Sequence, residues 1–438
     1  TFKGSPATPG KEFVASPDSW FRPVFSANGP DGAAYICDMY RKILDHPRYL
    51  PEHIRDQLDY GAGKTKGRIY RLTRKGAPPA SPRSLAQAPT AALVKNLDSP
   101  RAWPRETAYR LLLEGPAKAA VKALRATRLA RPAARVAASR LLANLGALQK
   151  GEVLKLLNDP SPRVREHGVQ LAEPLLAEAP VAGRIRQLAN DRDPLVRFHA
   201  ALILGFDDPA ARTTALAGIA ETVGGDEWTA AAVMSSLSGG DIEYVARHLL
   251  ATGRGAQAYA LMPALGQAAA RASTDVQAAN LVRLVSLSRS PADIAWKTAF
   301  VDGFSKGLRA RGLGKGRSPF ADLSARARTE ANVDWLFDLA AELATDAKAG
   351  EATRITAIQF LANSATPAST KSLQSLLNPK ESASIQSAAV ATLGKFGDAA
   401  IGEWLIAPDR WQGYSPNVRN SVISALLGHS TLIPQLIT

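Results

Sequence analysis

The sequence predicts a mainly α-helical protein: an array of helical repeats preceded by a small N-terminal β segment. Aromatic residues make up only 6% of the 438 residues. Long tracts rich in Ala, Leu and Arg favour helices that pack through small side chains. Related segments recur over most of the chain, whereas residues 1–74 show short aromatic and β-branched runs between turn signals.

Residues 1–74 are expected to contain strands. The runs FRPVF, AAYICDMY and GRIYRL are short and are bounded by turn signals at residues 28–32 and 61–63. An antiparallel sheet of this size needs partners on its faces to be stable. The segment is therefore expected to be part of a larger β structure.

A linker and an array of repeats should follow this segment. Residues 75–89 are rich in Pro, Ala and Ser, which predicts a linker. From residue 90, several segments share one pattern of Leu, Asn or Asp, Pro and an Arg-bearing helix, because Asp or Asn caps a helix and Pro fits its first turn. Aligning Pro160 with Pro194 gives a repeat of 34 residues, within the range of helical-hairpin solenoids. The pattern predicts a HEAT-like α-solenoid over residues 90–290.

An interruption is predicted at residues 291–330, consisting of a helix and a basic, Gly-rich loop, before helical repeats resume over residues 331–438. The stretch SKGLRARGLGKGRSP contains no acidic residue and predicts an exposed loop between helical blocks. Its basic residues are Lys306, Arg309, Arg311, Lys315 and Arg317.

The positive charge indicates an anionic partner or a merely basic surface. The 54 basic and 39 acidic residues give a net charge of +15, which makes nucleic acid, anionic lipid and acidic proteins candidate partners. Nine basic residues spread over three predicted helices would form a cationic stripe on the concave face of a solenoid, or a simple solvated face. They are Arg105, Arg110, Lys118, Lys122, Arg125, Arg128, Arg131, Arg135 and Arg140.

Several kinds of site are not supported by the sequence. Gly63-Lys64-Thr65 resembles the end of a phosphate-binding loop, but Leu58 occupies the position of its first Gly, and a strand is predicted to follow where the motif requires a helix. The six histidines show no zinc-protease spacing, so no metal site is predicted. The single cysteine, Cys37, excludes an intrachain disulfide and a C-x-x-C-H haem attachment in these residues. No apolar run approaches the ~18 residues of a membrane span, and no signal peptide opens the chain.

Residues 1–74 resemble the last blade of a β-propeller in the membrane-bound dehydrogenases that are abundant in planctomycetes and verrucomicrobia. These are relatives of the sugar and sorbosone dehydrogenases of the quinoprotein glucose dehydrogenase type. The residues that carry the resemblance are Trp20-Phe21-Arg22-Pro23, Gly29-Pro30-Asp31-Gly32 with Tyr35, Asp38-Met39-Tyr40-Arg41, His46-Pro47 and Gly67-Arg68-Ile69-Tyr70-Arg71.

The resemblance implies a scaffold or docking segment of an exported or periplasmic dehydrogenase. In that family a HEAT-repeat solenoid follows the propeller, and a cytochrome c domain commonly follows the solenoid. This sequence has the order blade, linker and repeats, but it lacks most of the propeller and the haem motif. The chain is therefore not expected to be an enzyme by itself. A PQQ-like cofactor and haem c would belong to the complete protein, and a redox or scaffold protein, such as a haem protein, would be its partner.

The same resemblance suggests site residues, if the blade lines a propeller channel. Arg22 and Arg41 would bind an anionic cofactor or substrate oxygen, and Asp38 and His46 would be candidate catalytic residues, with His46 as the base. In the alternative interpretation, Asp38 pairs with Arg41 and the segment around His46 is only a loop.

Two other functions remain open at this point. The chain could be a HEAT-like nucleic-acid-binding protein, similar in architecture to the alkylpurine DNA glycosylases, with a cationic concave face on the phosphates. It could also be an active partner subunit, with the missing blades and haem supplied by another polypeptide. The sequence does not identify the substrate, the cofactor or the redox partner.

Overall fold

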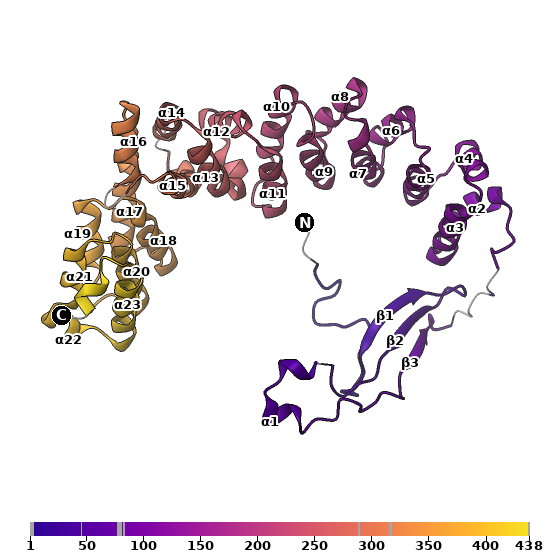
Figure 1. The fold of residues 1–438 in the computed structure, drawn as a ribbon, viewed down its shortest axis with the longest axis horizontal. Coiled ribbons are helices and arrows are strands. Elements are labelled where there is room, and N and C mark those ends of the chain that lie inside the picture. The colour runs from indigo at the N-terminus through magenta and orange to yellow at the C-terminus, as the bar shows by residue number, and fades with distance from the viewer. Residues whose placement is uncertain are drawn as a thin grey trace. The chain divides into compact units, whose positions relative to one another are not determined.

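The protein is mainly α-helical, with a small sheet near its N-terminus (Figure 1). The computed structural model describes residues 4–44, 46–76, 81, 84–287, 290–314 and 318–436. The chain divides into two units, Thr1–Val181 and Ala182–Thr438. The predicted fold class, a helical array with a small N-terminal β segment, is confirmed.

The β segment is a three-stranded antiparallel sheet in the order β1-β2-β3. A tight turn joins β1 and β2, and Gly32 within it has a φ of +81°, which favours glycine. A Cβ on Gly29 would lie 2.2 Å from the ring of Tyr35, so the turn needs glycine there as well. The strands match the predicted runs and span Pro23–Asn28, Ala34–Asp38 and Arg68–Leu72. A 3₁₀ turn at Pro47–Tyr49 and α1, Glu52–Arg55, lie between β2 and β3.

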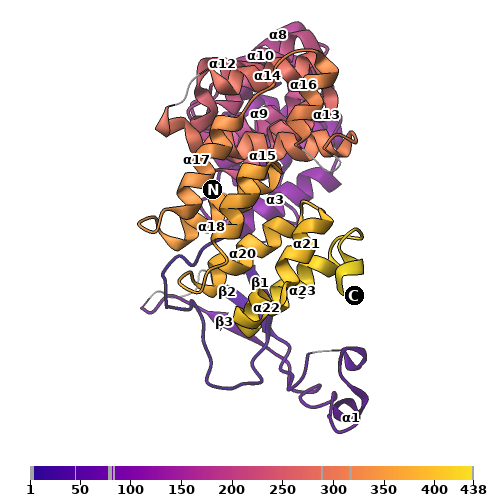
Figure 2. The same ribbon diagram turned by 90° about the vertical axis from the view of Figure 1, so that its left-hand side faces the viewer.

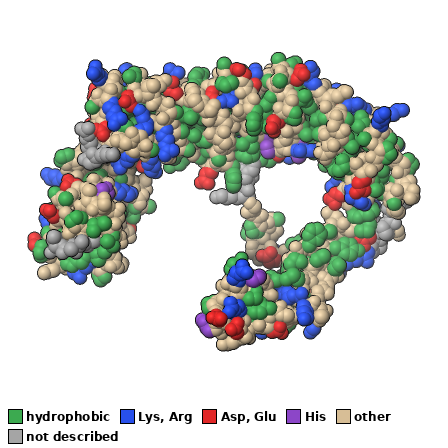
Figure 3. All heavy atoms as spheres, in the orientation of Figure 1, with side chains coloured by type: hydrophobic (Ala, Val, Ile, Leu, Met, Phe, Trp, Pro, Cys, Tyr) green, Lys and Arg blue, Asp and Glu red, His purple; other side chains and the backbone are tan. Residues whose placement is uncertain are grey.

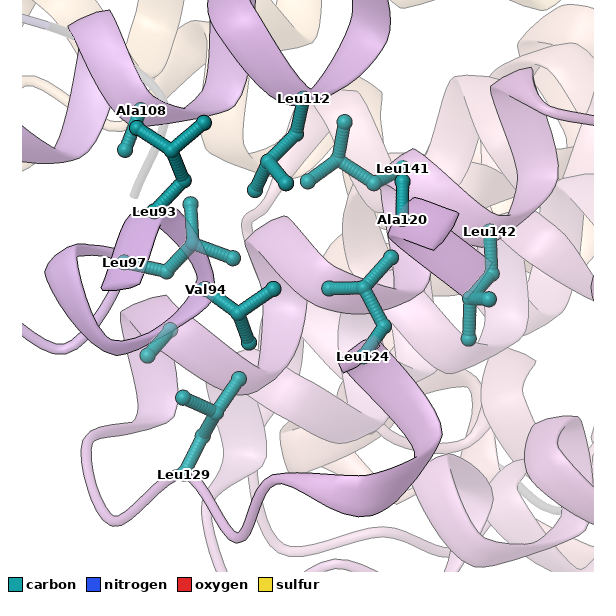
Figure 4. Packing of buried hydrophobic residues seen from close by; sticks show 11 residues of the cluster. Leu93, Val94, Leu97, Ala108, Leu112, Ala120, Leu124, Leu129, Leu141 and Leu142 are labelled. Atoms are coloured by element: carbon teal, nitrogen blue, oxygen red, sulfur yellow. The ribbon is translucent and has the colours of Figure 1, made fainter. Parts of the chain in front are cut away.

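Paired helices make up the rest of the first unit. Helices α3, α5 and α7 lie in one row, and α4 and α6 lie in the other (Figure 1). Leucine and alanine side chains meet between the rows, with Leu112, Leu124 and Leu141 almost fully buried (Figure 4). The helices are α2 Thr90–Asn96, α3 Ala102–Glu114, α4 Ala117–Ala126, α5 Pro132–Asn144, α6 Lys150–Leu157 and α7 Pro162–Leu171, and α8 Ala179–Leu188 leads into the second unit.

The second unit continues with helices of six to seventeen residues. Among the described residues, no helix is both long and apolar enough to cross a membrane. The helices are α9 Pro194–Leu204, α10 Pro209–Ala220, α11 Glu227–Ser236, α12 Gly240–Thr252, α13 Met262–Ala272, α14 Asp275–Ser286, α15 Ile294–Ala310, α16 Pro319–Ala327, α17 Asp334–Thr345, α18 Glu351–Phe360, α19 Pro367–Ser375, α20 Ala383–Gly394, α21 Ala399–Ile406, α22 Pro408–Gly413 and α23 Pro416–Leu427.

The repeat is shorter than the predicted 34 residues. Helices α3, α5, α7 and α9 begin 30, 30 and 32 residues apart. Pro162 begins α7, whereas Pro160 lies in the turn before it, so Pro162 is the equivalent of Pro194. With this alignment His167 and His199 both lie five residues after the first proline of their helices.

An arginine three residues after each of these helix starts closes the preceding turn. Nη1 of Arg165 donates to the carbonyl oxygens of Asp159 and Pro160, at 2.9 and 3.1 Å. Nη1 of Arg197 donates in the same way to Asp191, at 2.7 Å. These charged donors satisfy carbonyl groups in the turns, where helical hydrogen bonds are absent. The four arginines are Arg105, Arg135, Arg165 and Arg197.

The predicted exposed loop in SKGLRARGLGKGRSP is wrong for its first six residues, which belong to α15. Gly303 and Gly307 face α13, where a Cβ would lie 1.9 Å from the Pro263 oxygen and 2.5 Å from the Gln267 oxygen. These glycines therefore allow close contact between two helices instead of marking a loop. A short turn follows α15, and the predicted loop residues Lys315 and Arg317 lie outside the described residues.

Candidate functional site

Asp38 joins the neighbouring strands at one end of the sheet instead of facing a ligand. Its side chain is buried, and one carboxylate oxygen accepts the backbone N–H groups of Arg22, at 2.8 Å, and Tyr40, at 2.9 Å. Its other oxygen lies 3.7 Å from Nε of Arg68. The alternative in which Asp38 pairs with Arg41 is wrong, since the ion partner of Asp38 among the described residues is Arg68 and Arg41 donates to backbone oxygens. Sequence reasoning missed Arg68, although the cross-strand register places it opposite Asp38.

The two predicted ligand-binding arginines are used by nearby backbone groups. Nη1 of Arg22 donates to the carbonyl oxygens of Ser19, at 2.6 Å, and Phe21, at 3.2 Å. Nη1 of Arg41 donates to the carbonyl oxygens of Met39 and Tyr40, each at 3.2 Å. Arg22 therefore holds the segment before β1, and Arg41 holds the turn after β2.

His46 caps the 3₁₀ turn that follows it. Its Nδ1 accepts the backbone N–H of Arg48 at 3.1 Å, and its ring lies edge-on to Tyr49. Among the described residues, His46 contacts Arg48 and Tyr49 and makes no hydrogen bond or ion pair with Asp38, Arg22 or Arg41. The structure thus brings Asp38 and Arg22 together through a backbone group and leaves His46 in a separate turn.

Tyr40 is the most constrained residue of this segment. Its φ is +51°, in the left-handed region that non-glycine residues seldom adopt. The guanidinium of Arg68 lies 4.1 Å from the centre of its ring, and the Trp20 ring lies 5.8 Å away. Gly63 is required beside it, because a Cβ there would lie 2.3 Å from the Tyr40 oxygen. A hydrogen bond to Asp18 raises the pKa of Tyr40. The residues of the resemblance therefore build a tightly held turn.

A second polar cluster fixes the turn between β1 and β2. Asp31 accepts the N–H of Ala33, at 3.1 Å, and the hydroxyl of Tyr35, at 3.0 Å, and it pairs with Arg71. Burial alone would raise the pKa of Asp31, but these three donors outweigh it and lower the pKa overall. The cluster locks the hairpin in one register.

The phosphate-binding interpretation of Gly63-Lys64-Thr65 stays excluded. These residues lie in a turn, with the Lys64 N–H donating to the Gly61 oxygen at 3.0 Å, and β3 follows. The predicted strand after the motif is confirmed, and no helix N-terminus is present there to bind a phosphate. Among the described residues, no group of three or more His, Cys, Asp and Glu side chains is placed to hold a metal ion.

The sheet itself exposes a large amount of apolar surface. Every residue of β1 is exposed, and Val24, Phe25 and Ile69 are 56%, 66% and 68% exposed. Hydrophobic side chains gather over the strands in the space-filling view (Figure 3). A groove lined by Phe13, Ala34 and residues of β1 runs along the sheet. Contiguous apolar surface of this kind marks an interaction site. The sequence analysis predicted the need for partners on the sheet but not which residues would be left uncovered.

The nine predicted basic-surface residues do not form one stripe. Arg105, Arg110, Arg135 and Arg140 lie on α3 and α5, whereas Lys118, Lys122 and Arg125 lie on α4 in the other row, and Arg128 and Arg131 lie in the turn between. The helical-hairpin geometry separates them, because successive helices alternate between rows.

Five of these basic residues also have intramolecular acceptors. Arg135 makes a two-pronged ion pair with Asp159, with both N–O distances at 2.8 Å. Arg125 pairs with Glu152 at 2.9 Å, which raises the pKa of Arg125. The remaining partners are turn carbonyls for Arg105, Glu114 for Arg110, and His167 with Gln170 for Arg140. Much of this charge therefore stabilises contacts within and between repeats.

Comparison with known proteins gives one family match. Residues 1–76 match a family model described as a domain of unknown function (DUF7133). A search of curated proteins finds no match.

Similar solved structures include the karyopherin Kap121p bound to Pho4p, with 12% identity and a TM-score of 0.40, covering 78% of this chain and 46% of that chain. Kap121p bound to RanGTP gives 12% identity, a TM-score of 0.41 and coverage of 81% and 48%. An engineered protein gives 17% identity, a TM-score of 0.34 and coverage of 79% and 99%. The chain thus spans about half the length of the Kap121p chains, and the family match is confined to its sheet-bearing N-terminal part.

Proposed function

We propose that this chain is the scaffold or docking segment of an exported, quinoprotein-like sugar dehydrogenase whose catalytic propeller and haem domain lie outside it. In this proposal the sheet is the terminal blade of the propeller, and the helical repeats present a surface to a protein partner. The observation that carries the proposal is the exposed apolar sheet joined to a helical-repeat array.

The sheet supports this proposal because it is incomplete as a folding unit. A three-stranded sheet with Val24, Phe25 and Ile69 exposed leaves apolar surface in water, which is unfavourable by about 25 cal/mol per Å². Burying these side chains against further strands would remove that cost. Neighbouring blades of a propeller pack face to face and would provide such a cover.

The proposal places the catalytic groups outside this chain. Arg22, Arg41, Asp38 and His46 each use at least one polar atom for turns and caps of the segment itself. The proposal places no PQQ-like cofactor on them, since His46 lies in a turn separate from Asp38 and Arg22. The cofactor and haem c are therefore assigned to other parts of the complete protein, and no step of the reaction is assigned to this chain.

The nucleic-acid alternative has weaker support from the geometry. A phosphate-binding face requires basic side chains that are free on one surface. Here five of the nine basic residues donate to acceptors within the chain: Arg105, Arg110, Arg125, Arg135 and Arg140. The other four, Lys118, Lys122, Arg128 and Arg131, lie on α4 or in the turn after it.

The test is isolation of the protein as made by its source organism, without denaturation, followed by an assay of dye-linked oxidation of aldose sugars. The proposal predicts that this activity co-purifies with peptides of the present chain through successive columns. Separation of the chain from all such activity would contradict it.

A further inference from the structure

A second feature of the molecule, unrelated to the β segment, is a groove between α20 and α23 with basic residues on its wall. These helices lie side by side near the C-terminal end (Figure 2). The groove has a volume of about 600 Å³. Small residues line much of it, and the helices approach so closely that a Cβ on Gly394 would lie 2.8 Å from that of Ala425. Small side chains allow the main chain of a bound segment to come close to the helices.

The charge of this groove is positive. Arg309 from α15 and Lys395 after α20 lie on its wall, together with His429, and the described lining residues include no acidic side chain. Asn420 and Ser424 add neutral hydrogen-bonding groups from one face of α23. The groove therefore presents cations and donors to whatever enters it.

Arg309 is not used in an ion pair within the described residues. Its Nη2 donates to the Ala362 oxygen at 2.9 Å. Asp302 is occupied by Lys306, at 2.7 Å. Because Arg309 is not paired with a carboxylate of the described residues, a carboxylate brought by a ligand can pair with it.

His429 is held in place at the same groove. The Thr431 hydroxyl donates its proton to the Gly397 oxygen at 2.6 Å. It therefore acts as the acceptor in its 2.8 Å contact with His429, and Nδ1 of the imidazole is the donor. The ring packs against Gly397, where a Cβ would lie 2.4 Å from it. The wall of the groove is therefore fixed before any ligand binds.

We propose that this groove binds an acidic segment of a protein partner, with Arg309 and Lys395 pairing to its carboxylates and Asn420 and Ser424 hydrogen-bonding to its oxygens. The inference rests on the scaffold part of the proposed function and adds the chemistry of the partner. A peptide fits better than a nucleic acid, because no Phe, Tyr or Trp is among the described lining residues to stack on bases.

The experiment is fluorescence anisotropy on the purified full chain with a fluorescein-labelled peptide of alternating Glu and Ser residues. Lys395→Glu should weaken binding about tenfold, because it replaces an attraction with a repulsion. The matched control, Lys371→Glu, makes the same charge change at an exposed position of α19 outside the groove and should change Kd less than about twofold. Ser424→Leu, which fills the groove without changing charge, should also weaken binding.

Equal loss of affinity in the Lys395 and Lys371 variants would overturn the inference, since it would show binding to the overall positive charge. Binding of a DNA duplex that Lys395→Glu abolishes, with no binding of the acidic peptide, would also overturn it. If the isolated protein carries dehydrogenase activity but the wild-type chain does not bind the peptide, the groove assignment fails and the scaffold proposal stands. If the peptide result holds and the activity separates from the chain, the dehydrogenase proposal fails and the groove stands.

Discussion

Replacing Gly303 with alanine should destabilise the protein, although alanine is the better helix former. Gly303 lies in α15 at its crossing with α13, and the new Cβ would lie 1.9 Å from the Pro263 oxygen. Real Cβ atoms essentially never approach closer than 3.0 Å, so the helices must shift by about 1.1 Å at this point. Gly266 and Gly307 make similarly close contacts along the same crossing, so a local shift would disturb them as well.

The expected magnitude follows from two opposing effects. Overpacking costs about 1–3 kcal/mol, and here the clashing atom belongs to the backbone and has little freedom to move. The change from glycine to alanine within a helix contributes about 0.5–1 kcal/mol in the other direction. We expect a net loss of about 1–2 kcal/mol in the free energy of unfolding.

Gly183→Ala is the matched control. Gly183 lies within α8 in the same unit, and a Cβ there would meet no atom within 4 Å. The same substitution should therefore stabilise the protein by about 0.5–1 kcal/mol. Urea unfolding followed by far-UV circular dichroism and by tryptophan fluorescence measures both, since Trp296 is buried in α15. A Gly303→Ala protein as stable as the wild type would refute the close-packing explanation.

Two further predictions concern arginine contacts, one half-buried and one buried. Arg165→Ala removes two hydrogen bonds to the turn before α7 and should lower the free energy of unfolding by about 1–3 kcal/mol. The control, Arg128→Ala in an exposed turn, should change it by less than ~0.5 kcal/mol. Equal urea midpoints for the two variants would contradict this prediction. Asp241→Asn leaves Arg212 buried and unpaired, with side chains 4% and 7% exposed, and should cost about 3–5 kcal/mol at neutral pH. Burial would raise the pKa of Asp241, but bonds from Thr213, Arg212 and a backbone N–H lower it below 3.8, so its contribution is present above that pH and is lost as the pH falls through the folded-state pKa. As the pH is lowered, the urea midpoint of Asp241→Asn should therefore fall less steeply than that of the wild type. Parallel curves for the two proteins would contradict the role given to the Asp241 carboxylate.

The parts of the fold that sequence analysis predicted correctly have local causes. The three strands lie between turns that need glycine, such as the one at Gly32, and these turn signals are visible in the sequence. The start of α9 follows from Asp193, whose carboxylate caps the helix, and from Pro194 in its first turn.

The errors concern features that depend on distant residues or on a choice between two local signals. The stretch from Asp159 to Pro162 contains two prolines, each preceded by a residue that can cap a helix, and only tertiary packing selects Pro162 as the start of α7. The glycines of α15 resemble loop glycines until α13 is packed against them.

The same limit applies to the candidate sites. Arg135 pairs with Asp159, and Arg125 with Glu152, across 24 and 27 residues of sequence, so composition cannot reveal that these charges are used internally. The groove at Arg309 brings together residues from three separate helices and was not predicted, although Arg309 was noted in a basic stretch. Arg68 lies opposite Asp38 because of the register between β2 and β3. The sequence of such short strands does not determine that register before they pair.

The proposal that this chain is part of a larger dehydrogenase is tested most directly by the intact mass and the visible absorption spectrum of the protein isolated from its source organism. The proposal predicts that the 46.5 kDa chain is found within a longer polypeptide or a stable complex that shows the Soret band of haem. A native species of 46.5 kDa without a chromophore and without an associated polypeptide would contradict it.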